Sequence, residues 1–130
     1  MRKRLLLDTQ AWLWWLKDER RLSAAARRAI ANVRSARYFS VAGAWELTIK
    51  CSIGKLRLAL HVGRLLTDHL AANQTDLLGI TMADLIRLES LAWHHRDPFD
   101  RLMAAQAIER GLSIVSSDEV FEKYGLDRVW

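Results

Sequence analysis

Short apolar runs alternate with amphipathic stretches along the whole 130-residue chain, and this alternation constrains the fold more than any other feature. The apolar runs predict strands at residues 4–7, 37–41, 77–81 and 112–115, with a short edge strand at 127–129. The stretches between them repeat apolar residues three and four apart, which predicts helices at 9–17, 24–33, 42–53, 62–72, 82–93, 98–111 and on through 124. Strands that alternate with helices favour one α/β sheet, in a single domain over residues 1–130.

Two of these helices begin with clear N-cap signals. Ser23 precedes one, and Asp97 precedes another that has Pro98 at its first position. We therefore give Asp97 a structural role. Residues 56–60, where leucines alternate with Arg57 and Ala59, are either extended or a loop, and the pattern leaves both open.

The net charge of +5 is unevenly distributed. Residues 1–37 contain ten Lys and Arg against three acidic residues, whereas residues 38–130 contain ten against twelve. A basic amino-terminal third favours a polyanion such as nucleic acid as a partner, although a solvated arginine-rich helix face explains the same charges.

The sequence also favours a reducing compartment. Cys51 is the one cysteine, so it cannot form an internal disulfide, and it fits a small buried side chain. Asp8 ends the apolar stretch that follows the basic start, which argues against a signal peptide. The uncharged run at residues 9–16 is shorter than the roughly 20 residues that cross a bilayer. We expect a cytoplasmic protein with no membrane partner.

Four carboxylates each lie just past an apolar run or one turn into the next segment, namely Asp8, Glu46, Asp100 and Asp118. Such positions meet at the carboxyl edge of a parallel sheet, so we expect the four to converge. Two unit charges about 4 Å apart cost about 4 kcal/mol at an effective dielectric of about 20. The cluster therefore predicts a counter-ion, and an all-oxygen site suits Mg²⁺ or Mn²⁺.

Each of these carboxylates also has a structural explanation. Asp8 and Asp118 can cap the helices that follow them, Glu46 can pair with Lys50, and Asp100 can complete a capping box with Asp97. Their joint placement favours a site, because no cap is needed at Glu46 and Asp97 suffices to cap its helix.

These segments resemble the PIN-domain nucleases, and within them the VapC-type ribonuclease toxins of bacterial toxin–antitoxin pairs. The resemblance runs through Leu-Leu-Leu-Asp-Thr at 5–9, Trp-Glu-Leu-Thr-Ile-Lys at 45–50, His-His-Arg-Asp-Pro-Phe-Asp-Arg at 94–101 and Ser-Ser-Asp at 116–118, and covers essentially the whole chain. Gly43 departs from the more usual Ser or Ala. The resemblance implies a Rossmann-like parallel sheet of about five strands flanked by helices, with an acidic pocket at its carboxyl edge.

The resemblance further implies metal-dependent cleavage of RNA, such as tRNA, by metal-activated water. It assigns the family's acidic quartet to Asp8, Glu46, Asp100 and Asp118, and its small hydroxyl positions to Thr9 and Ser116. We expect Asp8 and Asp100 to ligate Mg²⁺ or Mn²⁺ directly. Asp118 and Glu46 would ligate it through water, help to deprotonate the attacking water, or hold a second ion.

Other residues near these motifs have weaker assignments. Lys50 and Arg101 either hold substrate phosphates or form plain salt bridges. His94 and His95 suggest a zinc pair, but adjacent side chains point apart, so a polar loop is the better explanation. The tryptophans expected in the core are Trp12, Trp15, Trp45 and Trp93, whereas Trp14 lies off that face and is expected to be exposed, where it could stack on RNA or pack against a partner.

The resemblance implies two protein partners. A cognate VapB-like antitoxin would lie across the amino-terminal helices, where Trp12, Trp15 and Leu16 form an apolar stripe, and a second copy would form a homodimer. Three alternatives remain: a PIN nuclease acting on other RNA or single-stranded DNA outside any toxin pair, a PIN fold that binds RNA without cleaving it, and a phospho-receiver domain. A receiver would need adjacent carboxylates after the first strand, where Thr9 follows Asp8.

Overall fold

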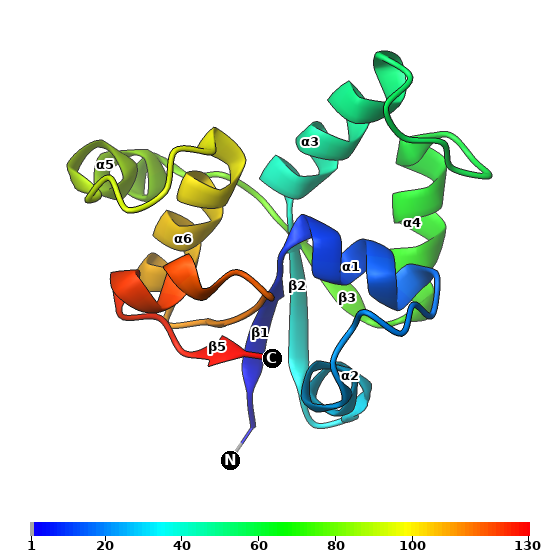
Figure 1. Cartoon of the computed structure of the whole chain (residues 1–130), viewed down its shortest axis with the longest axis horizontal. Helices are drawn as coiled ribbons and strands as arrows, with labels where there is room; N and C mark the ends of the chain where they lie inside the picture. The colour runs from blue at the N-terminus through cyan, green and yellow to red at the C-terminus, as the bar shows by residue number, and fades with distance from the viewer. Residues whose placement is uncertain (1) are drawn as a thin grey trace.

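Five parallel strands form the centre of the protein (Figure 1). The computed structural model describes residues 2–130. The strands are β1 (Arg4–Leu7), β2 (Ala36–Ser40), β3 (Thr75–Leu78), β4 (Ser113–Val115) and β5 (Arg128–Val129). They lie in the order β3-β2-β1-β4-β5, and each pairs in parallel with its neighbour. The predicted α/β class and parallel sheet are confirmed.

Helices connect the strands at nearly the predicted positions. They are α1 (Thr9–Leu16), α2 (Ala24–Ala31), α3 (Val41–Ser52), α4 (Val62–Ala72), α5 (Met82–Ser90) and α6 (Pro98–Arg110), followed by the 3₁₀ helix η1 (Glu119–Tyr124). Side chains of the preceding residues cap most of them. The predicted caps Ser23 and Asp97 accept hydrogen bonds from backbone N–H groups of α2 and α6, and Asp8 and Asp118 do the same for α1 and η1.

One strand has different bounds from those predicted, and one segment that the sequence left open is now assigned. The third strand begins at Thr75, earlier than the predicted 77. It is an edge strand with Leu77 half-exposed, so it needs no continuous apolar run, and residues 79–81 instead lead into the α5 cap at Thr81. Residues 56–60 form a loop between α3 and α4.

The central strands are buried on both faces. Leu5 and Leu7 of β1 point to one face with Phe39 of β2, while Leu6 points to the other, as the alternation of side chains along a strand requires. Helices α1, α2 and α4 cover the first face, and α5, α6 and η1 cover the second (Figure 1). This burial explains why β1 is an uninterrupted run of leucines.

The tryptophans divide between core and surface differently from the prediction. Trp12 is in the core, with its ring centroid 5.0 Å from that of Phe39. Trp45 and Trp93 were expected in the core, and this was wrong, because 56% and 75% of their surfaces are exposed. Helical spacing identifies residues that share a face but does not say which face meets the sheet. Trp14 was expected to be exposed and is half-buried.

The strand order creates a crevice at the carboxyl edge of the sheet. From β1 the chain proceeds through β2 to β3 on one side and returns to place β4 and β5 on the other. The point where the direction reverses lies between β1 and β4, which is where ligands bind in open α/β sheets. None of the helices in residues 2–130 combines the length and apolar character needed to cross a bilayer.

Candidate active site

The four predicted carboxylates line one pocket at this carboxyl edge. The pocket has a volume of about 180 Å³ and is lined by Asp8, Thr9, Gln10, Glu46, Lys50, Asp100, Ser117 and Asp118. Asp8 follows β1, Glu46 lies in α3, Asp100 lies in the first turn of α6, and Asp118 follows β4. Segments remote in sequence therefore meet there, as expected.

Asp8 is the most buried of the four, with 8% of its surface exposed. Its Oδ1 accepts a hydrogen bond of 2.7 Å from the Ala11 backbone N–H, which fixes the side chain while it caps α1. Burial raises the pKa of Asp8 to about 6, and the charges of Glu46 and Asp118 act in the same direction. Hydrogen bonds from the Ser116 hydroxyl and from Ala11 oppose the rise in pKa.

Asp100 is perturbed more strongly. Burial raises its pKa to about 7, and the charge of Asp97 adds to the rise, while His95 opposes it. Burial thus disfavours the charged forms of two pocket carboxyls and holds their pKa values well above the ordinary 3.8. A cation in the pocket would favour the ionised forms of both.

The donor set fits a hard divalent cation. The pocket offers carboxylate and hydroxyl oxygens from four segments. The Thr9 side chain is 5% exposed, and its Oγ1 is buried without a hydrogen-bond partner among the described residues. A buried hydroxyl without a partner is costly, so this oxygen is suited to an additional ligand in the pocket. The other predicted hydroxyl, that of Ser116, is fully buried and accepts a hydrogen bond of 3.0 Å from the Asp118 N–H.

Glu46 both forms a salt bridge within α3 and lines the pocket. Lys50 Nζ lies 2.9 Å from Glu46 Oε2, one helical turn away, so the predicted salt bridge exists. Glu46 nevertheless lines the pocket, and so does Lys50. The Lys50 ammonium group therefore balances the charge of Glu46, one of the four carboxylates, at the rim of the pocket.

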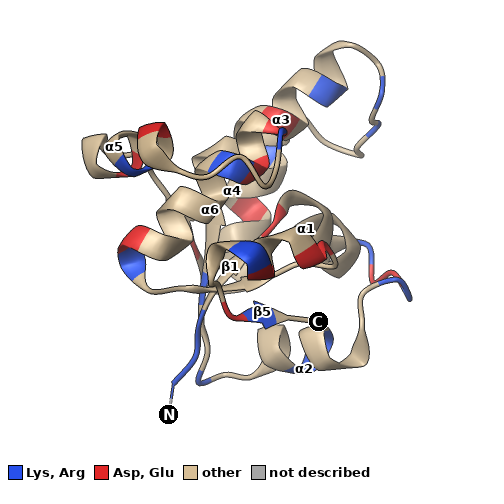
Figure 2. Cartoon of the chain, turned by 60° about the vertical axis from the view of Figure 1, so that its left-hand side comes forward, with Lys and Arg blue, Asp and Glu red and all other residues tan. Residues whose placement is uncertain are grey.

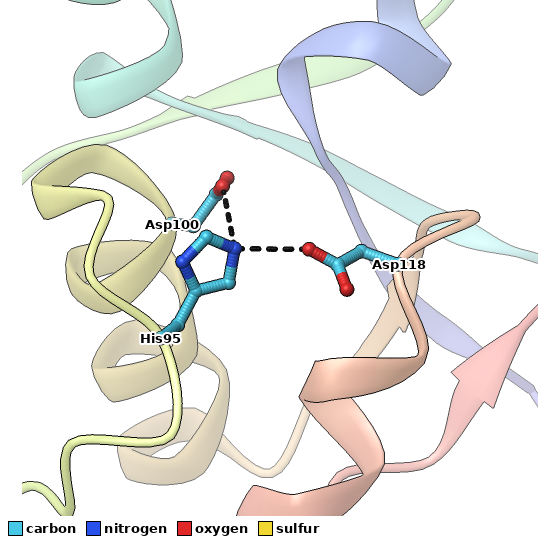
Figure 3. Close-up of side chains that lie close together, drawn as sticks. All are labelled: His95, Asp100 and Asp118. Atoms are coloured by element: carbon cyan, nitrogen blue, oxygen red, sulfur yellow. Dashed lines mark hydrogen bonds and ion pairs between the residues drawn. The ribbon is translucent and has the colours of Figure 1, made fainter.

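His95 lies in the loop before α6, as predicted, but its contact with two pocket carboxylates was not predicted. Its Nε2 lies 2.9 Å from Asp118 Oδ2 and 3.2 Å from Asp100 Oδ2, so one ring nitrogen contacts both carboxylates (Figure 3). His94 points elsewhere, with its ring packed edge-on against Tyr124 at 5.0 Å. The signal in the sequence was the position of His95, two residues before the Asp97 cap and five before Asp100.

Hydrogen bonding fixes the tautomer of His95. The Asp97 backbone N–H donates to Nδ1 at 3.1 Å, so a neutral ring carries its proton on Nε2. His95, Asp100 and Asp118 offer ligand atoms within 4.8 Å of one another, a spacing that would suit a metal ion. However, a metal-binding histidine normally donates from its second nitrogen, and here that nitrogen accepts. The imidazole is therefore placed to donate to the carboxylates.

Arg101 does not reach the pocket, so its predicted contact with substrate phosphate is wrong. The side chain is 4% exposed and donates to the backbone carbonyls of Leu91, Ala92 and His95. The exposed ring of Trp93 covers the guanidinium at 3.6 Å. Arg101 follows Asp100 directly on α6 and points about 100° away from it around the helix. Its role is to hold the segment that carries His95.

The apolar stripe predicted to bind an antitoxin, formed by Trp12, Trp15 and Leu16, also needs correction. Trp12 is 1% exposed and packs inside the protein, so it cannot line a surface groove. Trp15 and Leu16 are partly buried against the same core. Of the three residues, these two remain candidates for a surface contact.

Gly43 has a packing role that the sequence did not reveal. A Cβ at this position would lie 2.7 Å from the Phe39 ring and 3.1 Å from Thr9 Oγ1. The first contact is closer than packed atoms tolerate, and the second is tighter than an ordinary van der Waals contact. Glycine thus allows α3 to approach β2 and brings Glu46 to the pocket.

Comparison with known proteins identifies the class. The PIN-domain family model matches residues 5–126, and the chain belongs to this family. The phospho-receiver alternative is thereby excluded. Within the family, the chain is 32% identical over 117 residues to Ribonuclease VapC22 of Mycobacterium tuberculosis (strain ATCC 25618 / H37Rv), covering 88% of this chain and 86% of that protein.

Solved structures show the same fold at lower identity. A chain of the VapBC2 complex from Rickettsia felis, bound to a promoter DNA fragment, superposes with a TM-score of 0.69 and 13% identity, over 98% of this chain and 99% of that one. A chain of VapBC-1 from nontypeable Haemophilus influenzae gives 0.66 and 14%, over 96% of both chains.

Proposed function

We propose that this PIN domain is an endoribonuclease, the toxin of a toxin–antitoxin pair, and that it hydrolyses phosphodiester bonds in RNA. The observation that carries the proposal is the single pocket in which four carboxylates from remote segments meet, two of them with raised pKa values. The similarity to a protein named as a ribonuclease supports RNA as the substrate class.

Mg²⁺ or Mn²⁺ is the proposed cofactor, held by Asp8, Asp100 and Asp118, with Glu46 acting through water. When bound, such an ion supplies neutralisation of phosphate charge and acidification of water. The residues of the chain then have separate tasks. Backbone N–H groups donate hydrogen bonds to the Asp8 and Asp118 carboxylates and orient them. Ser116 restrains both residues. Glu46 is the proposed acceptor of the proton of the attacking water.

His95 and the pocket hydroxyls complete the arrangement. His95 Nε2 donates to Asp118 and lies 3.2 Å from Asp100 Oδ2, so it keeps the two carboxylates together when no cation balances them. Thr9 offers its unpaired hydroxyl to whatever occupies the pocket. Lys50 remains a candidate for contact with the substrate phosphate, since it lines the pocket rim.

The test is cleavage of RNA by Asp8→Asn. Asparagine keeps the volume and accepts the same capping bond from Ala11, so the fold is retained while the ligand charge is lost. We expect cleavage to be abolished, with an unchanged circular dichroism spectrum. Asp76→Asn, the same change on the exposed edge strand, is the matched control. Wild-type cleavage by Asp8→Asn would refute the metal assignment.

The proposed partners follow from the relatives. The similar structures are toxin–antitoxin complexes by name, which supports a VapB-like antitoxin as the partner here. A small antitoxin gene directly upstream would distinguish this from a PIN nuclease that works alone on other RNA or single-stranded DNA. The homodimer and the cytoplasmic location also belong to the proposal. Trp45, Ile49 and Ile53 form an exposed apolar stripe on α3 that a second copy would bury, and light scattering would measure the mass.

A further inference from the structure

A second hollow, of about 410 Å³, adjoins the acidic pocket, and we call it the basic groove. Helix α1 and the turn after it line one side, and the end of α3 with the following turn lines the other. Its lining includes Leu13, Trp14, Lys17, Arg21, Lys55 and Leu56. Gln10 and Lys50 line both hollows, so the groove lies next to the acidic pocket.

The charge of the groove is opposite to that of the pocket. Four cations line it against one acid, Glu19. Two of the cations are engaged, since Lys50 contacts Glu46 at 2.9 Å and Arg21 contacts Glu19 at 3.5 Å. Within residues 2–130, Lys17 and Lys55 have no carboxylate oxygen inside 4.0 Å. The basic residues at the end of α3 and in the connection after it are visible in Figure 2.

Helix capping explains only part of this pattern. Lys17 is the C-cap of α1, where a cation interacts favourably with the helix dipole. Lys55 lies beyond the α3 C-cap at Ile53, and its backbone N–H already satisfies the Lys50 carbonyl at 2.9 Å. Its side-chain charge therefore has no structural partner in the described part of the chain. The two free ammonium groups belong to opposite walls of one groove.

We propose that the basic groove binds the sugar-phosphate backbone of the RNA beside the cleaved bond, with Lys17 and Lys55 contacting phosphates. The inference rests on the proposed ribonuclease function. An acidic pocket repels a polyanion, so cations at its edge are needed to hold the flanking phosphates. Leu56, which is partly buried at the groove wall, supplies apolar surface for the sugar.

The contacts within the groove argue for recognition of the backbone rather than of base sequence. Trp14 is the aromatic side chain in the lining, and Arg21 lies over its ring at 5.2 Å while Trp130 packs against it at 5.7 Å. The ring is therefore occupied and does not serve as a base-stacking platform. Phosphate contacts position a nucleic acid without reading its sequence.

The test measures RNA affinity against salt concentration. The reference protein is Asp8→Asn, which prevents cleavage, and the probe is a fluorescein-labelled single-stranded RNA of mixed sequence. The variant adds Lys17→Ala and Lys55→Ala. Each lost phosphate contact lowers the slope of log Kd against log salt by about 0.7 for single strands, so the slope falls by about 1.4. At 0.1 M salt the same relation predicts binding about 25-fold weaker.

A matched control removes the same charge from the opposite edge of the sheet. Arg2→Ala with Arg34→Ala takes two exposed cations from the amino ends of β1 and β2. We expect it to bind RNA within twofold of the reference. Both pairs are surface changes, so thermal unfolding should change little, with the Lys17 change losing its interaction with the α1 dipole.

Three outcomes would overturn the inference: an unchanged slope in the lysine variant, an equal loss in the arginine control, or no RNA binding by the reference protein. A labelled oligo-glutamate of equal charge that competes as well as RNA would assign the groove to an acidic peptide instead. The proposed function is judged separately, because it depends on cleavage by the wild-type protein.

Discussion

Asp8→Asn should stabilise the metal-free protein at neutral pH, because the native carboxyl is held in an unfavourable charged form. The pKa of Asp8 rises from its ordinary value of 3.8 to about 6 in the folded protein. Below pH 3.8 both folded and unfolded chains are protonated at this position. As the pH rises towards 6, the unfolded chain releases the proton while the folded one retains it, so stability falls. Above 6 the loss is complete.

The size of the effect follows from the shift in pKa. Each unit corresponds to about 1.4 kcal/mol, so Asp8 should remove about 3 kcal/mol of unfolding free energy between pH 4 and 7. Asparagine does not titrate and keeps the Ala11 cap. The variant should match the wild type near pH 4 and exceed it by about 3 kcal/mol at pH 7. Asp100, with a pKa of about 7, changes wild-type stability in the same direction.

Urea unfolding in EDTA, followed by far-ultraviolet circular dichroism at several pH values, measures this difference. The Asp76→Asn control should follow the wild type at each pH, since Asp76 is exposed. A difference between Asp8→Asn and wild type that does not change with pH would refute the account. A variant that becomes less stable than the wild type as the pH rises would show that a cation-free pocket favours the charged form of Asp8.

Three further predictions follow from the same geometry. Mn²⁺ at 100 times its Kd should stabilise the wild type by about 2.7 kcal/mol in thermal unfolding, with the gain lost in Asp8→Asn. Gly43→Ala should lower the urea unfolding free energy by about 1–3 kcal/mol, because the new methyl group meets the buried Phe39 ring; equal stability would contradict this. Nitrogen-15 NMR of His95 should place the proton on Nε2 and leave it there when Mg²⁺ is added, whereas transfer to Nδ1 would indicate metal ligation.

The carboxylate cluster can be predicted from the sequence because it depends on the order of the strands in the sheet. Asp8 and Asp118 follow apolar runs that become β1 and β4, and these strands are neighbours at the switch point. Their convergence therefore depends on strand order and needs no knowledge of loop paths. Glu46 requires only that α3, which follows β2, begin close to the same edge. Asp100 lies on α6, which follows α5 and a loop, so its position also depends on that loop. The catalytic role of the quartet remains a prediction.

His95 and the surface tryptophans were missed because they depend on the path of one loop and on helix rotation. His95 reaches the carboxylates because Arg101 binds three carbonyls of residues 91–95, and no periodic pattern encodes that network. Trp45 shares a spacing with other apolar residues of α3, but the spacing is the same whether the face meets the sheet or solvent. The direction of Arg101 was open to prediction, since neighbours on a helix point apart.

A carboxylate at a strand end can cap a helix and line the pocket at the same time, because it has two oxygens. Asp118 accepts the Val120 N–H with Oδ1 and contacts His95 with Oδ2. Asp8 likewise uses Oδ1 for the Ala11 N–H, which leaves Oδ2 without that restraint. A helix cap thus fixes the rotamer with one oxygen and presents the second to the site. A carboxylate that caps a helix at a sheet switch point is therefore better regarded as a positioned ligand than as a residue whose role is already explained.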